Sequence, residues 1–565
     1  MTIAKTRDYK LQIMLFIVFL YIVLFCVYPI SKLLIHTVFP ASGNFIAFFS
    51  KALQDKTVQK AIFNTFESSI LSAFFSLLIG TIFALLITLT DIKHKALLVF
   101  LLLVPMLIPA QITAVSWLEL VSPSGPLSAI LKYFNLLGTS NPLYSKEGVI
   151  LLLSIEHSAM VFLAVRAGIY SIPANIIEAA RCSGASQIKI VFYIILPLLA
   201  PYLIAGLALA FVASIGNFGI PALLGIPGRY LVLSTLIYQR LSSFGPSVLE
   251  NVGILSTVLI MMAILGLLVQ YSANKRNKIQ IIEGGRIDSP FRLGKYAFGV
   301  EFLSWFFLLF ISVLPLIALV KTSLIPALGM DFSINNITLE NFMFAIADDV
   351  SSRAFVNSTF LGLLTAFVVA LFGVLLSYVS VIRKNRVANL LSLIADAPFA
   401  LPGIVLSIAC IIAFIRPLPI VNFSLYNTIW IILVAYLARF LAFGMKPVIA
   451  SMLQLDSSLE EAAEIVGSDS FSRLRHIILP QILPSVMAGA VLVFMGAFNE
   501  LTVSSLLWSV NNETLGVVIY NLYDEGNATG AAAISVLTVI VTLAIVGALS
   551  FFARKLPKGT LPWQT

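Results

Sequence analysis

The sequence predicts an all-α polytopic membrane protein with about twelve transmembrane helices in two parallel, pseudo-symmetric halves. Hydrophobic residues make up 59% of the chain and charged residues 11%, whereas a soluble domain carries about 25% charged residues. Apolar runs of about 20 residues recur along the chain, and each can cross a hydrocarbon core about 30 Å thick. We expect helices, because a segment in lipid must satisfy its own backbone hydrogen bonds. A polar pattern that occurs twice indicates the two halves.

Twelve apolar segments are the expected spans. Those of the first half are 11–36, 62–89, 96–118, 148–170, 199–223 and 252–272, and those of the second half are 299–321, 356–382, 388–415, 425–448, 485–508 and 533–553. Basic residues gather in the loops that alternate with the basic N-terminus, so the positive-inside rule predicts that both termini are cytoplasmic. The net charge of +9 therefore reflects membrane orientation and does not indicate a nucleic-acid partner.

The repeated polar pattern has two copies that lie 283 residues apart. The first copy is Glu178, Ala179, Ala180, Gly184, Pro197 and Pro201, and the second is Glu461, Ala462, Ala463, Gly467, Pro480 and Pro484. Both copies fall on the cytoplasmic side of the predicted topology. Because each half has an even number of spans, the two halves are expected to share one orientation. We expect a first half at 1–272, a cytoplasmic linker at 273–298 and a second half at 299–565.

Each copy lies in a polar loop, at about 172–196 and 455–479, which is expected to form a short helix, a glycine turn and a second short helix. Pro173 suits the first turn of a helix, and Gly184 is a typical helix end. Asp456 and the two serines after it supply N-cap residues in the second loop. Small alanines let another surface approach closely. One copy alone would be an ordinary loop, whereas two copies with matched spacing indicate two docking surfaces.

The two loops share Glu-Ala-Ala, three further residues, a glycine and a proline thirteen positions on. This pattern resembles the cytoplasmic signature of the integral-membrane permease of bacterial binding-protein-dependent ABC importers. Two six-span halves fused in one chain resemble the ferric-iron type, as do the phrases at 216–225 and 498–503. The resemblance implies alternating-access import of a solute delivered by a binding protein. Ferric iron is the first expectation, and thiamine, phosphonate or polyamine are the alternatives.

The resemblance also implies partners. In that family the loop docks into a groove of a cytoplasmic ATPase. This role is carried here onto Glu178, Ala179, Ala180, Gly184, Glu461, Ala462, Ala463 and Gly467. Two ATPase subunits that hold ATP and magnesium, a periplasmic or tethered binding protein, surrounding lipid and an inner-membrane location are implied.

This chain itself is not expected to be an enzyme, and no cofactor or metal site is assigned to it. Its nearest approach to a nucleotide-binding loop is Gly294-Lys295, which lacks the upstream glycine and is followed by Tyr296. ATP hydrolysis is therefore expected on a separate subunit. An ion-coupled secondary transporter with parallel halves is the alternative, and such a protein would have no ATPase to dock.

Ionisable residues at membrane depth are costly and mark candidate functional sites. The candidates for the translocation pathway are Glu156, Arg439, Asp396, Asn217, Asn499 and Glu500. Glu156 and Arg439 lie 283 residues apart, so they occupy equivalent places in the two halves. We expect them to form an ion pair in one state of the cycle, and separate positions near outer-leaflet headgroups are the alternative. For the others, lining a pathway and satisfying a neighbouring helix are both open.

Two pairs of prolines mark interruptions of equivalent spans. Pro105 and Pro109 in the first half correspond to Pro398 and Pro402 in the second, at an offset of 293. Paired interruptions in two halves of a transporter point to the translocation site. Kinks that serve packing alone are the other interpretation. Movement of the breaks would alternate inward and outward openings as the ATPases close.

Overall fold

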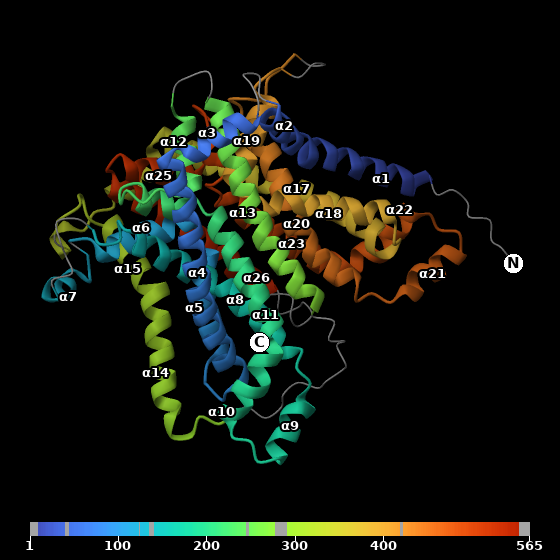
Figure 1. Cartoon of the computed structure of the whole chain (residues 1–565), viewed down its shortest axis with the longest axis horizontal. Coiled ribbons are helices and arrows are strands. Elements are labelled where there is room, and N and C mark those ends of the chain that lie inside the picture. The colour runs from blue at the N-terminus through green and yellow to red at the C-terminus, as the bar shows by residue number, and fades with distance from the viewer. Residues whose placement is uncertain are drawn as a thin grey trace.

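The computed structural model of the chain is a bundle of long helices whose two halves splay apart at one end (Figure 1). The structure describes residues 9–39, 45–123, 125–134, 141–243, 248–276, 291–330, 332–417 and 422–552. Most of the predicted linker and both ends of the chain, including the basic residues Lys5 and Arg7, lie outside these ranges. The regular secondary structure of the described residues is helical, and their one β-type contact is an isolated bridge between Thr90 and Phe291.

The helices of the first half run from Tyr9 to Arg276. They are α1 (Tyr9–Tyr21), α2 (Tyr28–Val38), α3 (Phe45–Gln54), α4 (Lys56–Leu89), α5 (Lys95–Leu107), α6 (Ala110–Val121), α7 (Ser128–Tyr133), α8 (Lys146–Tyr170), α9 (Ala174–Cys182), α10 (Gln187–Ile190), α11 (Leu196–Gly216), α12 (Leu233–Leu241) and α13 (Val248–Arg276). Short π-helical turns join α1 to α2 and α10 to α11, so each of these pairs continues as one span.

The helices of the second half run from Ala297 to Phe552. They are α14 (Ala297–Leu308), α15 (Leu314–Ser323), α16 (Glu340–Ala347), α17 (Asp349–Ser377), α18 (Arg386–Ala400), α19 (Gly403–Phe414), α20 (Ile429–Met452), α21 (Ser457–Ile465), α22 (Ser470–Arg473), α23 (Leu479–Phe498), α24 (Ser504–Leu507), α25 (Leu515–Asp524) and α26 (Ala528–Phe552). Equivalent π-helical turns join α14 to α15 and α22 to α23.

The prediction of about twelve spans is confirmed. Within the described residues, ten helices are long and apolar enough to cross a membrane, and the number is twelve if each of two bent helix pairs counts as one span. The bent pairs are α5 with α6, at 103°, and α18 with α19, at 106°. The predicted spans 96–118 and 388–415 are therefore each two helices at nearly a right angle.

Proline chemistry explains both bends. Pro109 and Pro402 directly precede α6 and α19, and the residue before each proline is extended, with φ/ψ of −91°/140° at Ile108 and −76°/142° at Leu401. The ring of a proline clashes with a helical conformation of the preceding residue, so the first helix of each pair must end there. The chain restarts a helix at once in a new direction.

Two other predicted spans differ from the structure at both ends. The expected segments 199–223 and 485–508 belong to continuous helical spans at Gln187–Gly216 and Ser470–Phe498. The second short helix of each polar loop is thus the start of the following span. Both spans end early because Asn217 and Glu500 turn the chain, as described below.

The first span of each half packs onto the opposite half. Tyr21 in α1 donates a hydrogen bond of 2.8 Å to the carbonyl oxygen of Leu437. Ser312, between α14 and α15, donates one of 2.8 Å to the carbonyl oxygen of Leu101. Figure 1 shows the same exchange, with α1 beside α17 and α18 and with α14 beside α5. The halves are therefore tied together by reciprocal helices around one shared centre.

Candidate functional site: a central cavity and two coupling loops

A cavity of about 570 Å³ lies between the two halves. Its polar lining from the first half is Gln111, Glu156, His157, Asn217 and Gln270, and from the second half Asp396, Arg439, Lys446, Asn499, Glu500 and Thr502. All six sequence-predicted pathway residues therefore face one space. Pro402 lines it too, while Pro109 immediately precedes the lining residue Ala110.

The two bends form the closed end of the cavity. Gln111, in the first turn of α6, is 3% exposed, and its Nε2 donates to the carbonyl oxygen of Asn499 at 3.3 Å. Gly219 is so close to α6 that a Cβ there would lie 3.1 Å from the backbone nitrogen of Gln111. Gly216 faces Pro402 across the halves, at 3.7 Å from a Cβ position to Cα. At this end the backbones of the two halves touch.

The other end of the cavity is open. Asp396 and Lys446 are both exposed, in contrast to Gln111 and His157. Lys446 lies close to the end of α20, which leads into α21. Asp396 lies on α18, before the break at Pro402. The ammonium of Lys446 sits over the ring of Phe399 at 4.8 Å. The opening is thus on the side from which α9 and α21 project, apart from each other (Figure 1).

Equivalent positions are polar neighbours in each half. In the first half, Nδ2 of Asn217 donates to Oε2 of Glu156 at 3.0 Å. In the second half, Nε of Arg439 lies 3.9 Å from Oε1 of Glu500. Among the described residues no ion pair joins Glu156 to Arg439, so the predicted pair is not formed in this conformation. Each residue instead takes a partner from its own half, and both lie in mid-helix and line the cavity.

Asn217 and Glu500 also end their spans. Oδ1 of Asn217 accepts from the backbone N–H of Ile220 at 3.2 Å. Glu500 accepts from the N–H of Val503 at 2.8 Å and from that of Ser504 at 3.2 Å. A side chain that caps the next turn satisfies backbone donors that would otherwise be orphaned at membrane depth. These residues therefore both line the cavity and satisfy neighbouring backbone, the two roles that the sequence left open.

Sequence reasoning missed several lining residues. Lys446 could have been found, because it lies seven residues after Arg439 and so on the same face of α20. Gln111 follows the Pro109 break, yet an amide in an apolar run gives little signal. Glu67, which is not among the lining residues, pairs with Lys146 at 2.8 Å. His157 is 2% exposed and its Nδ1 lies 2.9 Å from Oγ of Ser214.

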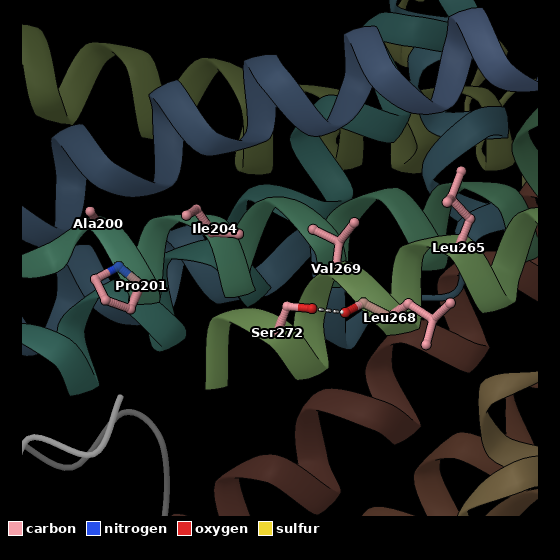
Figure 2. Close-up of a pocket in the computed structure, with 7 residues that line it drawn as sticks. All are labelled: Ala200, Pro201, Ile204, Leu265, Leu268, Val269 and Ser272. Atoms are coloured by element: carbon pink, nitrogen blue, oxygen red, sulfur yellow. Dashed lines mark hydrogen bonds between the residues drawn. The ribbon is translucent and has the colours of Figure 1, made fainter. Parts of the chain in front are cut away.

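A second pocket, of about 440 Å³, lies between α11 and α13 (Figure 2). It is lined by Ala200, Pro201, Ile204, Leu265, Leu268, Val269 and Ser272. The one polar side chain, that of Ser272, donates to the carbonyl oxygen of Leu268 at 2.8 Å, as the dashed line in Figure 2 shows. The pocket offers no charged group to a polar solute, so the central cavity is the candidate pathway.

The two polar loops, here called the coupling loops, end their first helices in the same way. Gly184 and Gly467 have φ of +78° and +86°. The N–H of Ala185 reaches the carbonyl of Ala180 at 3.0 Å, and that of Ser468 reaches Ala463 at 3.1 Å. This is the six-to-one hydrogen bond of a Schellman turn, whose left-handed residue is glycine because a Cβ is strained there. The glycine spacing is thus a backbone requirement.

The coupling helices α9 and α21 present matching outer faces. Glu178, Ala179, Glu461 and Ala462 are exposed, and Ala180 and Ala463 are half-buried. Apolar side chains beside them are also open to solvent. They are Ile176, Ile188, Leu459, Ile465 and Val466, and the last two are 84% and 86% exposed. Exposed apolar groups next to a charge are typical of an interaction surface.

The inner faces of the coupling helices differ. Ile177 and Ile190 are buried under α9. Arg181 stacks on Phe291 with 4.9 Å between the guanidinium carbon and the ring centroid. Phe291 lies within the predicted linker 273–298 and bridges to Thr90, so this part of the linker is anchored beneath the first loop.

The second loop has an ionic cluster at the positions equivalent to these isoleucines. Arg473 is 2% exposed; its Nε lies 3.1 Å from Glu460 and its Nη1 3.2 Å from Glu464. The hydroxyl of Tyr378 donates to Glu460 at 2.8 Å, and Arg383 binds Glu464 at 2.7 Å. Sequence reasoning missed the cluster because such charges in a polar loop look solvated.

Comparison with known proteins places the chain in a family. The profile of the family described as binding-protein-dependent transport system inner membrane component matches residues 76–275 and again 369–557. The chain therefore belongs to this family, and it contains two copies of the family's domain. It is a permease of an ABC importer and a multi-pass inner-membrane protein, which confirms the resemblance deduced from the coupling loops.

Three relatives show how far the likeness extends. The chain is 26% identical over 412 residues to a probable ABC transporter permease, y4fN, of Sinorhizobium fredii, covering 71% of this chain and 70% of that one. It is 25% identical to the ferric transport system permease FbpB of Actinobacillus pleuropneumoniae, covering 79% and 64%. It is 28% identical over 167 residues to the putative 2-aminoethylphosphonate transport permease PhnV of Salmonella typhimurium, covering 29% and 61%.

Proposed function

We propose that this permease imports ferric iron, delivered by a binding protein, through the central cavity, and that two copies of a cytoplasmic ATPase drive it from the coupling loops. The observation that carries this proposal is the matched construction of the two loops on the open side of the cavity. The proposal includes cytoplasmic termini, a division into halves at 1–272 and 299–565, and ATP and magnesium held by the ATPases rather than by this chain.

The geometry supports alternating access. The cavity is closed at the helix breaks that precede α6 and α19 and open toward α9 and α21, which is an inward-facing arrangement in the proposed orientation. Each coupling loop runs without interruption into a span that reaches the cavity, α11 from the first loop and α23 from the second. Movement of α9 or α21 would therefore displace the helix end that carries Asn217 or Glu500.

The coupling loops differ in charge, which bears on their partners. Residues 172–196 contain one acidic and two basic side chains, whereas residues 455–479 contain five acidic and two basic ones. Two copies of one ATPase would meet the exposed glutamate in both loops through the same basic group. Because the second loop has more acidic side chains around its glutamate, the contact of the ATPase with the second loop would be the more salt-dependent of the two.

Ferric iron is supported by the ferric permease relative, which matches most of this chain. The phosphonate permease relative supports the second candidate cargo, because its match, although shorter, is as similar in sequence. Both substrates would reach the permease on a binding protein, so the mechanism is the same for either.

Uptake into proteoliposomes tests the proposal. The full chain, its ATPase and its cargo-loaded binding protein are reconstituted, and cargo entry is followed with and without ATP. Gly184→Val and Gly467→Val should each abolish most ATP-dependent uptake, because valine is strained at a positive φ. Gly526→Val is the matched control, since Gly526 has φ of +89° outside the loops. Full uptake without the ATPase would reject the proposal in favour of a secondary transporter.

A further inference from the structure

The charges that line the central cavity are unequally committed to protein partners. Glu500 has the most contacts: its carboxylate accepts from two backbone N–H groups and faces Arg439. Glu156 is engaged by Asn217 at 3.0 Å. These carboxylates serve the fold, so they are poor candidates for direct ligands of a cation in transit.

The two basic side chains that line the cavity, Arg439 and Lys446, have hydrogen-bond donors that no described protein group accepts. Arg439 directs Nε toward Glu500 and Nη1 to the carbonyl oxygen of Leu401 at 3.4 Å, and its Nη2 has no protein partner among the described residues. Gly403 makes room for the guanidinium, since a Cβ there would lie 2.8 Å from Nη1. Lys446, two turns further along the same face of α20, sits over the ring of Phe399 and interacts electrostatically with Asp396, and within the described chain it makes no hydrogen bond. The two cations are about 10 Å apart along the helix.

The acidic groups do not form a metal site. Within the part of the chain that the structure describes, no three His, Cys, Asp or Glu side chains are grouped so that they could hold a metal ion. A hard cation such as ferric iron prefers several oxygen ligands at once. The cavity instead offers a guanidinium with a free Nη2 and, near Asp396, an ammonium with no hydrogen bond in the described chain, and both can form charge-assisted hydrogen bonds to an anion.

We propose that the central cavity is an oxyanion-binding site, in which Arg439 holds the anion at the closed end and Lys446 guides it at the open end. This rests on the proposed function, because it takes the cavity as the pathway. The oxyanion is a carboxylate or a phosphorus oxyacid, and it has two possible sources. It is either the solute itself, such as an organic phosphonate, or an oxyanion that is bound as a ligand to a ferric ion.

Binding to the purified full-length chain in lipid nanodiscs tests the site. Phosphorus NMR line widths report binding of inorganic phosphate and methylphosphonate, and equilibrium dialysis reports binding of citrate and ferric citrate. Arg439→Gln and Lys446→Gln should each weaken binding by roughly tenfold or more, because each removes a charge-assisted hydrogen bond. Arg416→Gln and Lys384→Gln are matched controls at exposed positions outside the cavity and should bind as the parent chain does.

Further variants separate binding from folding. Arg439→Lys should retain part of the affinity. Arg439→Gln combined with Glu500→Gln removes both charges of the ion pair, so no unpaired carboxylate remains, and it should still abolish the anion contact. Binding of phosphate or methylphosphonate supports a phosphonate-type solute. Binding of citrate or ferric citrate alone supports an oxyanion that enters as a ligand of the ferric ion.

Two results would overturn the oxyanion site. One is absence of binding by every anion up to roughly 10 mM. The other is binding of manganous ion that is lost in Asp396→Asn while phosphate and citrate do not bind. ATP-driven uptake that persists in either case would leave the proposed import function intact and reject only the oxyanion site.

Discussion

Asn217 donates a hydrogen bond to Glu156, and the residues 283 positions further on, Glu500 and Arg439, face each other in the same way. In each half the end of a long span is thus attached to the middle of a neighbouring helix. The first half uses a neutral donor with an acid, and the second half uses an ion pair. The cavity therefore combines a symmetric backbone with an asymmetric set of charges.

The Arg439–Glu500 contact should be needed for stability. Arg439→Met leaves the carboxylate of Glu500 buried with only its backbone donors, and we expect a loss of about 2 kcal/mol in unfolding free energy. Combining it with Glu500→Gln should recover most of that loss. Thermal unfolding in detergent measures both. Equal stability of Arg439→Met and the parent chain would show that the contact contributes nothing.

A charge swap between the halves should fail. Glu156→Arg combined with Arg439→Glu would place a carboxylate opposite Glu500, so uptake should be no better than in Glu156→Arg alone. Reconstituted uptake of the two variants provides the comparison. Recovery in the double variant would mean that Glu156 and Arg439 pair in another state of the cycle.

The ionic cluster under the second coupling loop should be replaceable by an apolar one. Arg473→Met alone should cost about 3 kcal/mol, because it leaves Glu460 buried without its closest cation. Glu460→Ile with Arg473→Ile copies the first loop, where Ile177 and Ile190 are buried, and should restore stability. Chemical unfolding of the three proteins is the measurement. A double variant as unstable as the single one would contradict this account.

Acid should loosen the contact between the start of the chain and the second coupling loop. The backbone N–H of Ser472 and the ammonium of Lys10 lower the pKa of Asp469. A lowered folded pKa gives stability above the unfolded pKa, about 3.9 for Asp, that is lost as pH falls through the folded value. Hydrogen exchange at Ser472 should therefore show less protection below about pH 4. In Asp469→Asn that pH dependence should disappear.

Much of the fold follows from local rules. Span number, the glycine turns at Gly184 and Gly467, and the breaks at Pro109 and Pro402 depend on short-range chemistry that a sequence displays directly. The exchange of first spans does not, because the apolar surface of α1 is non-directional and does not specify which half it covers.

The candidate site was only partly predictable for a related reason. The offset of 283 residues shows that Glu156 and Arg439 are equivalent, and equivalence by symmetry does not imply contact. Their actual partners, Asn217 and Glu500, come from the end of another span, whose early turn is decided by side-chain capping. The burial of Arg473 likewise depends on Tyr378 and Arg383, which are distant in sequence.

The most direct test of the account is the separation of the cavity walls during ATP turnover. Spin labels at Gln270→Cys and Phe399→Cys, cavity-lining positions from the two halves, are followed by pulsed EPR in the assembled transporter, after replacement of the three native cysteines. The account predicts that the two labels approach each other when the ATPases bind ATP and separate again after hydrolysis. Label distances that stay unchanged while cargo is transported would contradict it.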